Sequence, residues 1–241
     1  MRFLKLSSIV LLFVTGIAAG SASAVCSNAT VTGVWGYQIV TAVGQFTADG
    51  KGNITAGSQT VNQNGTVLKQ TFTGKYSVGA ACTGSLALNF TGGGSATAKF
   101  VLDNSNKGAQ IIDTTPGIVA AGTGFSEGTV TCGLSGKKAT LAVLLLGKII
   151  NPKTPIAYVA QVALDGKGNV SGSGTFDVGG TIRTANITGT YTEIANCTGT
   201  IEMTPKGSTT LNFAFVVVNA GKELLLVETD SNSAVAGNMQ Q

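Results

Sequence analysis

Apolar and polar residues alternate along most of this chain. Between residues 72 and 78, for example, Phe72, Tyr76 and Val78 share one face of an extended segment, and the other face is polar. Gly- and Asn-rich turns separate such segments about every ten residues, and no segment keeps a helical period. The pattern predicts strands at 33–40, 43–48, 52–62, 66–78, 84–90, 96–103, 109–114, 118–125, 139–149, 156–164, 168–177, 181–192, 198–204, 209–218, 222–229 and 233–239.

The strand pattern is part of an internal duplication. GQFTADGKG at 44–52 matches AQVALDGKG at 160–168, an offset of 116 residues (160 minus 44). TGKYSVGAACTGS at 73–85 matches TGTYTEIANCTGT at 188–200, an offset of 115 residues (188 minus 73). A repeat of this length has the size of a domain rather than of a solenoid turn. The chain is therefore expected to contain two copies of one domain.

Each copy contains eight short strands joined by tight turns, which predicts an antiparallel meander. Closing the meander into a barrel removes both sheet edges, which would otherwise invite aggregation. We therefore expect an all-β protein of two tandem antiparallel eight-stranded meander β-barrels, over residues 25–129 and 130–241. Two β-sandwiches are the alternative. The interior of an eight-stranded barrel is either filled by side chains or holds one small ligand.

The first residues predict a signal peptide rather than part of the fold. Arg2 and Lys5 precede the short apolar run SIVLLFVTGIAAG and the small residues SASA. This pattern predicts a leader over residues 1–24, cleaved after Ala24, and a secreted, periplasmic or cell-surface protein. A lipid anchor on Cys26 is the rival interpretation, and the valine before that cysteine disfavours it. No later apolar run is long enough for a membrane-spanning helix.

The four cysteines are placed equivalently in the two copies. Cys82 and Cys197 both precede Thr-Gly, and Cys26 and Cys132 each open their copy. Four cysteines allow three pairings, and the duplication favours Cys26–Cys82 with Cys132–Cys197, because a unit that once stood alone must close its own bridge. The chain has no histidine and no CxxC motif, so we expect no metal site.

Charge and composition argue against catalysis and against nucleic-acid binding. The net charge is only +4, and the basic residues are scattered rather than gathered in a patch. Without histidine there is no Ser-His-Asp or Cys-His machinery, and the 11 acidic residues form no recognisable glycosidase pair. No nucleotide fingerprint joins a strand to a helix. We expect a protein that is not an enzyme and uses no cofactor.

The motif DGKGN occurs at 49–53 and again at 165–169. A cation-binding loop is one interpretation, but an EF-hand needs more carboxylates and a bidentate glutamate. A hairpin turn, in which the aspartate accepts hydrogen bonds from the turn backbone, explains the motif with fewer requirements. We therefore predict two hairpin turns.

Candidate ligand-binding residues are the inward aromatic side chains and two acids that recur in both copies. The acids would hold a ligand's polar group if they face a barrel mouth, but we expect them at the outer face or the rim as solubilising charges. The first copy has Ala98 where the second has Phe213, so we expect more room in the first barrel. The candidates are Phe72, Tyr76, Phe100, Asp113, Tyr191 and Glu228.

Four short motifs of the first copy resemble a known family. They are G-x-x-G-Y (33–37), F-x-x-D-G-x-G-N (46–53), T-G-x-Y-[ST] (73–77) and C-T-G-[ST] (82–85). Together they resemble exported tandem-repeat β-proteins of acidobacterial-type soil bacteria, a family without an assigned activity. The second copy departs from the family pattern at the G-x-x-G-Y segment. The resemblance implies a barrel similar to a calycin or an allene-oxide-cyclase-type barrel, and such a likeness does not give a function.

The sequence thus predicts a secreted, non-catalytic two-barrel protein that binds a small apolar or carbohydrate-like ligand. A structural or adhesive component of the cell exterior is the alternative. An open cavity in either barrel favours ligand binding, whereas two solid interiors favour the structural role.

Overall fold

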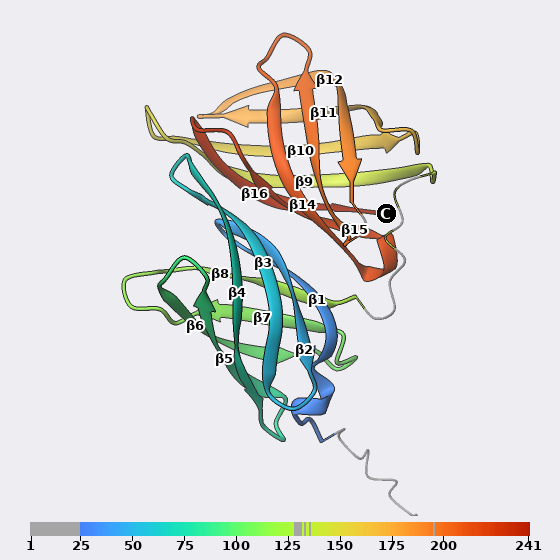
Figure 1. Cartoon of the computed structure of the whole chain (residues 1–241). Coiled ribbons are helices and arrows are strands. Elements are labelled where there is room, and N and C mark those ends of the chain that lie inside the picture. Colours follow the sequence, from blue (N-terminus) through green and yellow to red (C-terminus); the bar gives the residue numbers. More distant parts are fainter. Residues whose placement is uncertain (1–24, 128–131, 133, 135, 195) are drawn as a thin grey trace, which may run out of the picture.

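The computed structural model describes residues 25–127, 132, 134, 136–194 and 196–241 as two β-barrels (Figure 1). The predicted leader and the predicted boundary between the copies, at 129 and 130, lie outside the described residues. The first barrel is closed and antiparallel, each strand pairing with its neighbours in sequence and β1 pairing with β8. Its strands are β1 (Thr32–Ile39), β2 (Ala42–Asp49), β3 (Asn53–Gln63), β4 (Thr66–Val78), β5 (Thr83–Phe90), β6 (Ser95–Leu102), β7 (Gly108–Asp113) and β8 (Ala121–Ser126).

The second barrel repeats this topology and closes through the pairing of β9 with β16. Its strands are β9 (Ala139–Ile149), β10 (Thr154–Leu164), β11 (Asn169–Val178), β12 (Thr181–Glu193), β13 (Thr198–Pro205), β14 (Leu211–Val218), β15 (Glu223–Glu228) and β16 (Ser233–Gln240). Two short 3-10 turns, η1 (Asn28–Thr30) and η2 (Asn219–Gly221), complete the elements of the described chain. No helix among the described residues is long and apolar enough to cross a membrane.

The all-β class and the two tandem eight-stranded barrels confirm the sequence prediction, and the β-sandwich alternative is wrong. The expected strand ends agree with the structure to within three residues. The largest difference is at β8, which begins at Ala121 because residues 114–120 form a loop after β7.

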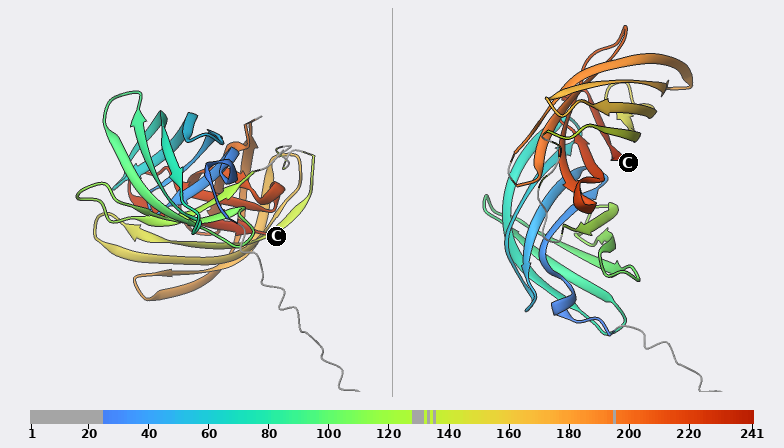
Figure 2. Two further views of the ribbon diagram at one scale, coloured as in Figure 1. Left: turned by 90° about the horizontal axis from the view of Figure 1, so that it is seen from below. Right: turned by 90° about the vertical axis from the view of Figure 1, so that its right-hand side faces the viewer.

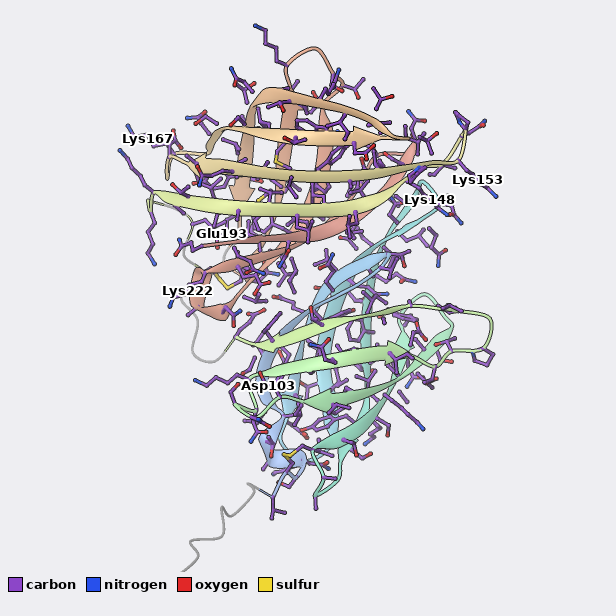
Figure 3. The ribbon with its side chains drawn as sticks, turned by 180° about the vertical axis from the view of Figure 1, so that it is seen from behind. Asp103, Lys148, Lys153, Lys167, Glu193 and Lys222 are labelled. Atoms are coloured by element: carbon purple, nitrogen blue, oxygen red, sulfur yellow. A yellow bond between two sulfur atoms is a disulfide. The ribbon has the colours of Figure 1, made fainter. Side chains whose placement is uncertain are left out.

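Apolar side chains from alternate positions of every strand fill the barrel interiors. Fully buried residues of the second interior include Leu141, Phe213, Phe215, Leu226 and Met239. The first interior has a smaller buried cluster, which includes Trp35, Ile54, Phe72, Tyr76 and Phe100. The labelled charged side chains, among them Lys148, Lys153 and Lys222, instead project from strand ends and turns (Figure 3).

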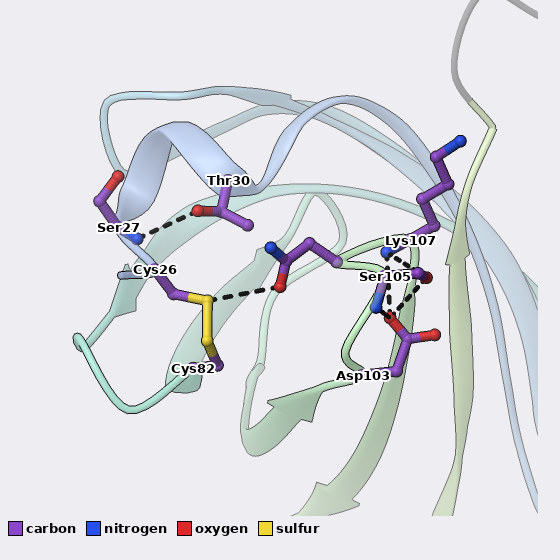
Figure 4. The surroundings of a disulfide bond; sticks show 8 residues. Cys26, Ser27, Thr30, Cys82, Asp103, Ser105 and Lys107 are labelled. Carbon is purple, nitrogen blue, oxygen red and sulfur yellow. Dashed lines mark hydrogen bonds between the residues drawn. A yellow bond between two sulfur atoms is a disulfide. The ribbon is translucent and has the colours of Figure 1, made fainter. Parts of the chain in front are cut away.

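One end of the first barrel is closed by η1 and by the predicted disulfide Cys26–Cys82 (Figure 4). The Tyr76 hydroxyl donates to the carbonyl oxygen of Val31 (2.5 Å) and lies 3.0 Å from that of Asn28, which holds η1 over the barrel end. The neighbouring Asp103 carboxylate accepts from Ser105 Oγ and from two backbone N–H groups of its own turn.

The equivalent end of the second barrel is closed in the same way. The predicted disulfide Cys132–Cys197 is present, and the Tyr191 hydroxyl donates to the carbonyl oxygen of Leu134 (3.3 Å). Both predicted pairings are therefore confirmed, and each lies within one copy of the repeat.

Both DGKGN motifs form hairpin turns, as predicted. Asp49 Oδ1 accepts from the backbone N–H groups of Lys51 (2.7 Å) and Asn53 (2.9 Å), and the Asn53 amide donates to Asp49 Oδ2. These hydrogen bonds from the side chain and backbone of Asn53 lower the pKa of Asp49 to about 2. Asp165 makes the same bonds with Lys167 and Asn169.

The barrels stack one above the other, in contact through β1–β3 of the first and β14–β15 of the second (Figures 1 and 2). A buried apolar cluster joins their outer walls, and the Gln38 amide donates to the Leu226 carbonyl (2.9 Å) across the contact. Asn62 of β3 is fully buried, and its amide donates to backbone carbonyls of the segment 228–233 of the second barrel. The cluster consists of Val43, Ala214, Val216, Val218, Leu225 and Val227, with Phe125 packed against it.

Candidate functional site

The first barrel contains a cavity of about 310 Å³. It lies at the end opposite the disulfide, where the turns 91–94 and 114–120 close the strands. Gly93, Thr115 and Ile118 form part of its rim. A cavity of this volume is at the small end of the range that ligand pockets occupy.

Most of the cavity wall is apolar. Aromatic and aliphatic side chains from β2, β5 and β7 face one another across it, and small alanines from β2 and β6 leave the central space open. Binding of an apolar ligand against this wall is favourable, because it removes apolar surface from water. The apolar residues that line it include Ala42, Phe46, Leu86, Leu88, Phe90, Ala98 and Ile111.

One side of the cavity carries a chain of polar side chains from β1, β3 and β4. The Tyr37 hydroxyl donates to Gln59 Oε1 (2.6 Å), and Gln59 Nε2 donates to Gln70 Oε1 (2.8 Å). Burial raises the pKa of Tyr37, so its phenol remains a neutral hydrogen-bond donor at physiological pH. These two hydrogen bonds link Tyr37, Gln59 and Gln70, and the Gln70 amide lies in the cavity lining.

Asp113, at the end of β7, lines the cavity near its rim. Its Oδ1 accepts a hydrogen bond from the backbone N–H of Thr115 (2.7 Å), which fixes the carboxylate beside the 114–120 loop. Among the described lining residues, Asp113 is the only charged side chain. The cavity therefore offers negative charge at its rim and no basic group to balance an anion.

The strand registers explain why the hollow lies in the first barrel. Val61 pairs with Ala42, whereas Phe176 pairs with Tyr158 at the equivalent place of the second barrel. Ala98 pairs with Asp113, whereas Phe213 pairs with Glu228. Three smaller residues of the first barrel thus correspond to three buried aromatic residues of the second. Ala42 corresponds to Tyr158, Val61 to Phe176 and Ala98 to Phe213.

The polar chain is also specific to the first barrel. Gln59 pairs with Gly44 on one side and with Gln70 on the other. In the second barrel, Gly174 takes the place of Gln59 and pairs with Ala160 and Ala185, so Ala185 takes the place of Gln70. The second copy therefore has no amide at either position.

The structure brings one of the predicted ligand residues, Asp113, into the cavity lining. Phe72 lies in the core beneath the cavity, with its ring centroid 6.5 Å from that of Tyr37 and 6.0 Å from that of Phe90. Tyr76 lies at the closed end, and Phe100 is buried against Gly84. These aromatic residues support the site but do not line it.

The two candidates in the second barrel occupy different places. Tyr191 lies at the closed end, and Glu228 is fully buried inside the barrel, where its Oε1 accepts from Ser233 Oγ (2.8 Å). Burial raises the pKa of Glu228 to about 7, and its Oε2 has no hydrogen-bond partner. The expectation of an outer or rim position is therefore wrong for Glu228, because the large aromatic side chains of this barrel occupy the space that is open at Asp113.

Sequence reasoning missed Gln59 and Gln70 as lining residues. A β-bulge between Ile54 and Gly57 shifts the alternation of β3 by one residue, which turns Gln59 inward. The one available signal was the pairing of two glutamines across adjacent strands, and it becomes visible only when the register is known.

No family model matches the chain, and no curated protein matches it in sequence. Among solved structures, the chain is similar to the crystal structure of the isotype 1 transferrin-binding protein B from serogroup B Neisseria meningitidis, with 9% sequence identity and a TM-score of 0.37. The superposition covers 83% of this chain and 65% of that chain, which is less than two thirds of that protein's length. Membership of the exported repeat family remains a prediction from the motifs.

Proposed function

We propose that this protein is a non-catalytic binding protein whose first barrel holds one small, mainly apolar ligand. The observation that carries the proposal is the cavity of about 310 Å³ with an apolar wall. Ala42, Val61 and Ala98 stand where the second barrel has aromatic residues, and these smaller side chains leave space beside the aromatic rings of Tyr37, Phe46 and Phe90.

The charge of the lining selects the ligand class. A carboxylate or sulfonate would lie near the Asp113 carboxylate without a basic partner, which costs free energy in a partly desolvated site. A neutral or cationic ligand avoids this cost. The Gln70 amide offers a hydrogen bond inside the cavity, and Asp113 offers an acceptor for a hydroxyl or ammonium group at the rim.

A carbohydrate-like ligand is the second candidate, and the polar chain of Tyr37, Gln59 and Gln70 is the observation that favours it. The apolar ligand is preferred because Gln59 is already bonded to Tyr37 and Gln70, while most other lining groups are aliphatic or aromatic. The two disulfides and the predicted leader over 1–24 support a place outside the cytoplasm.

Two fluorescent probes that share one skeleton test this proposal. N-phenyl-1-naphthylamine is neutral, and 8-anilinonaphthalene-1-sulfonate adds one sulfonate to the same rings. We expect saturable binding of the neutral probe at one site per chain and about tenfold weaker binding of the sulfonate. Asp113→Asn should narrow this difference, because it removes the charge at the rim.

Equal affinity for the two probes, or a difference that Asp113→Asn leaves unchanged, contradicts the assigned charge preference. Absence of saturable binding by either probe, together with saturable binding of an oligosaccharide, favours the second candidate.

A further inference from the structure

The contact between the barrels uses different faces of the two copies. The first barrel contributes the outer face of β1–β2, with Gly36, Gln38 and Val43, and the second contributes the outer face of β14–β15. The barrels are very close here, since a Cβ atom placed on Gly36 would lie 2.8 Å from Val216 Cγ1. Such a head-to-tail contact between repeated units leaves one copy of each face unpaired.

The unpaired faces are identified by the repeat. Val43 precedes Asp49 by six residues, as Val159 precedes Asp165, and the side chain of Val43 is 2% exposed whereas that of Val159 is 54% exposed. The β9–β10 face of the second barrel is therefore the uncovered equivalent of the β1–β2 face.

The β6–β7 face of the first barrel is likewise the uncovered equivalent of the β14–β15 face. Val101 follows Phe100 as Val216 follows Phe215, and their exposed fractions are 51% and 2%. Ile112 precedes Asp113 as Val227 precedes Glu228, and their exposed fractions are 55% and 0%. Val101 and Ile112 thus keep the apolar character of their equivalents, although no other part of the described chain covers them.

The β9–β10 face forms a contiguous apolar patch. Leu144 pairs directly with Val159, and Leu146 lies two residues further along β9 on the same side, opposite Ala157. Leu144 and Leu146 are large, exposed apolar side chains on the outside of the barrel. Exposed patches of this kind mark interaction sites.

We propose that the β6–β7 face of one copy of this protein docks on the β9–β10 face of a second copy, with the same pair of faces that joins the two barrels within the chain. A second copy is the partner that fits, because exposed apolar side chains lie on both open faces, Val101 and Ile112 on one and Leu144 and Val159 on the other. The contact is heterologous, so each added copy presents a new open face and the assembly grows end to end or closes into a ring.

The contact between copies is wider than the contact within the chain. Ala142 replaces Gly36 at the equivalent position, and its Cβ prevents the approach that the glycine allows. The side chain of Leu144, which stands where the first barrel has Gln38, fills the additional space. Leu146 stands where the first barrel has the exposed Val40, so it extends the contact beyond the one within the chain.

The contact between copies is also more polar, because Lys99, Asp103 and Gln110 stand where the second barrel has Ala214, Val218 and Leu225. The aliphatic stem of Lys99 covers apolar surface while its charge stays in water.

Sedimentation velocity over protein concentrations from about 1 μM to about 1 mM tests the proposal, because this range covers weak and moderate association. The purified protein should show a weight-average mass that rises with concentration. Leu146→Lys blocks the β9–β10 face and Ile112→Lys blocks the β6–β7 face, so each variant alone should remain monomeric. An equimolar mixture should form dimers and nothing larger, because each variant keeps the face that the other lacks.

Ile182→Lys is the matched control, since Ile182 is exposed on β12 and belongs to neither face. This variant should associate as the unaltered protein does. Circular dichroism confirms that each variant is folded, and Leu144→Ser tests the same face if Leu146→Lys does not fold.

A mass that stays monomeric across the whole range overturns the proposal. The proposal is also overturned if Leu146→Lys fails to associate while Ile112→Lys associates as the unaltered protein does. This result would indicate a symmetric contact between two β9–β10 faces. A mixture that fails to form dimers does the same.

Discussion

Replacing Glu228 by glutamine should make the protein less sensitive to pH between 5 and 8. The Glu228 carboxyl is fully buried in the second barrel, and burial raises its pKa from the usual 4.5 to about 7. The folded protein therefore binds this proton more tightly than the unfolded chain does. The contribution of this carboxyl to stability is greatest below about pH 4.5, falls as the pH rises toward 7, and is lost above it.

The size of the effect follows from the pKa. A rise from 4.5 to about 7 corresponds to about 3 kcal/mol of unfolding free energy, because one pKa unit is worth about 1.4 kcal/mol. Glu127, which is buried between the barrels, also has its pKa raised to about 7 by burial and adds a second contribution of the same sign. Glutamine at 228 stays neutral and removes the first contribution only.

Urea unfolding at pH 5 and pH 8 measures this difference. Between these pH values, the unaltered protein should lose roughly twice as much stability as Glu228→Gln. Asp113→Asn is the matched control, because Asp113 occupies the equivalent position in the hollow barrel, and this variant should keep the full pH dependence. If Glu228→Gln and the unaltered protein lose the same stability between pH 5 and pH 8, the buried carboxyl does not titrate in this range and the reasoning is refuted.

Two further predictions concern the contact between the barrels. Gly36→Ala should lower the unfolding free energy by about 1–3 kcal/mol, because the new Cβ would lie 2.8 Å from Val216 Cγ1. Gly92→Ala is the control and should have little effect, because Gly92 has open space around it. Equal stability of the two variants in urea would contradict this prediction. Asn62→Ala should cost about 2–3 kcal/mol, because it leaves backbone carbonyls of the segment 228–233 without their buried donor, and unchanged thermal and urea unfolding would show that the link is dispensable.

The strands and their order could be predicted because each strand carries its own signal. Residues 72–78 alternate, and β4 spans Thr66–Val78 as expected. DGKGN turns and equivalent cysteines repeat the same information in both copies, so the barrel topology and both disulfides followed from local patterns together with the duplication.

The cavity could be predicted only in part, because its lining depends on register. Ala98 against Phe213 indicated which barrel has more room. The inward position of Gln59 depends on the bulge after Ile54, and simple alternation from Ile54 would turn Ser58 inward instead. A bulge of this kind is fixed by the pairing of β3 with both neighbours rather than by its own residues.

The sequences of β14 and β15 indicate that these strands are buried on both faces, but they do not indicate which residues cover the outer face. The runs FVVV in β14 and LLLV in β15 do not alternate, which is typical of strands buried on both faces. The residues that cover their outer side, such as Val43 and Gln38, lie far away in sequence. The burial of Glu228 has the same origin, since it depends on how aromatic residues from several strands meet.

The central claim is that the hollow of the first barrel is the ligand site, and one pair of variants tests it most directly. Ala98→Phe places in the cavity the ring that the second barrel carries at its equivalent position, so the barrel geometry accommodates it. Ala87→Phe adds the same ring to the exposed outer face of β5 as a control. In a titration with N-phenyl-1-naphthylamine, Ala87→Phe should bind as the unaltered protein does and Ala98→Phe should lose saturable binding. Undiminished binding by Ala98→Phe would contradict the account, because the ligand would then lie outside the first barrel.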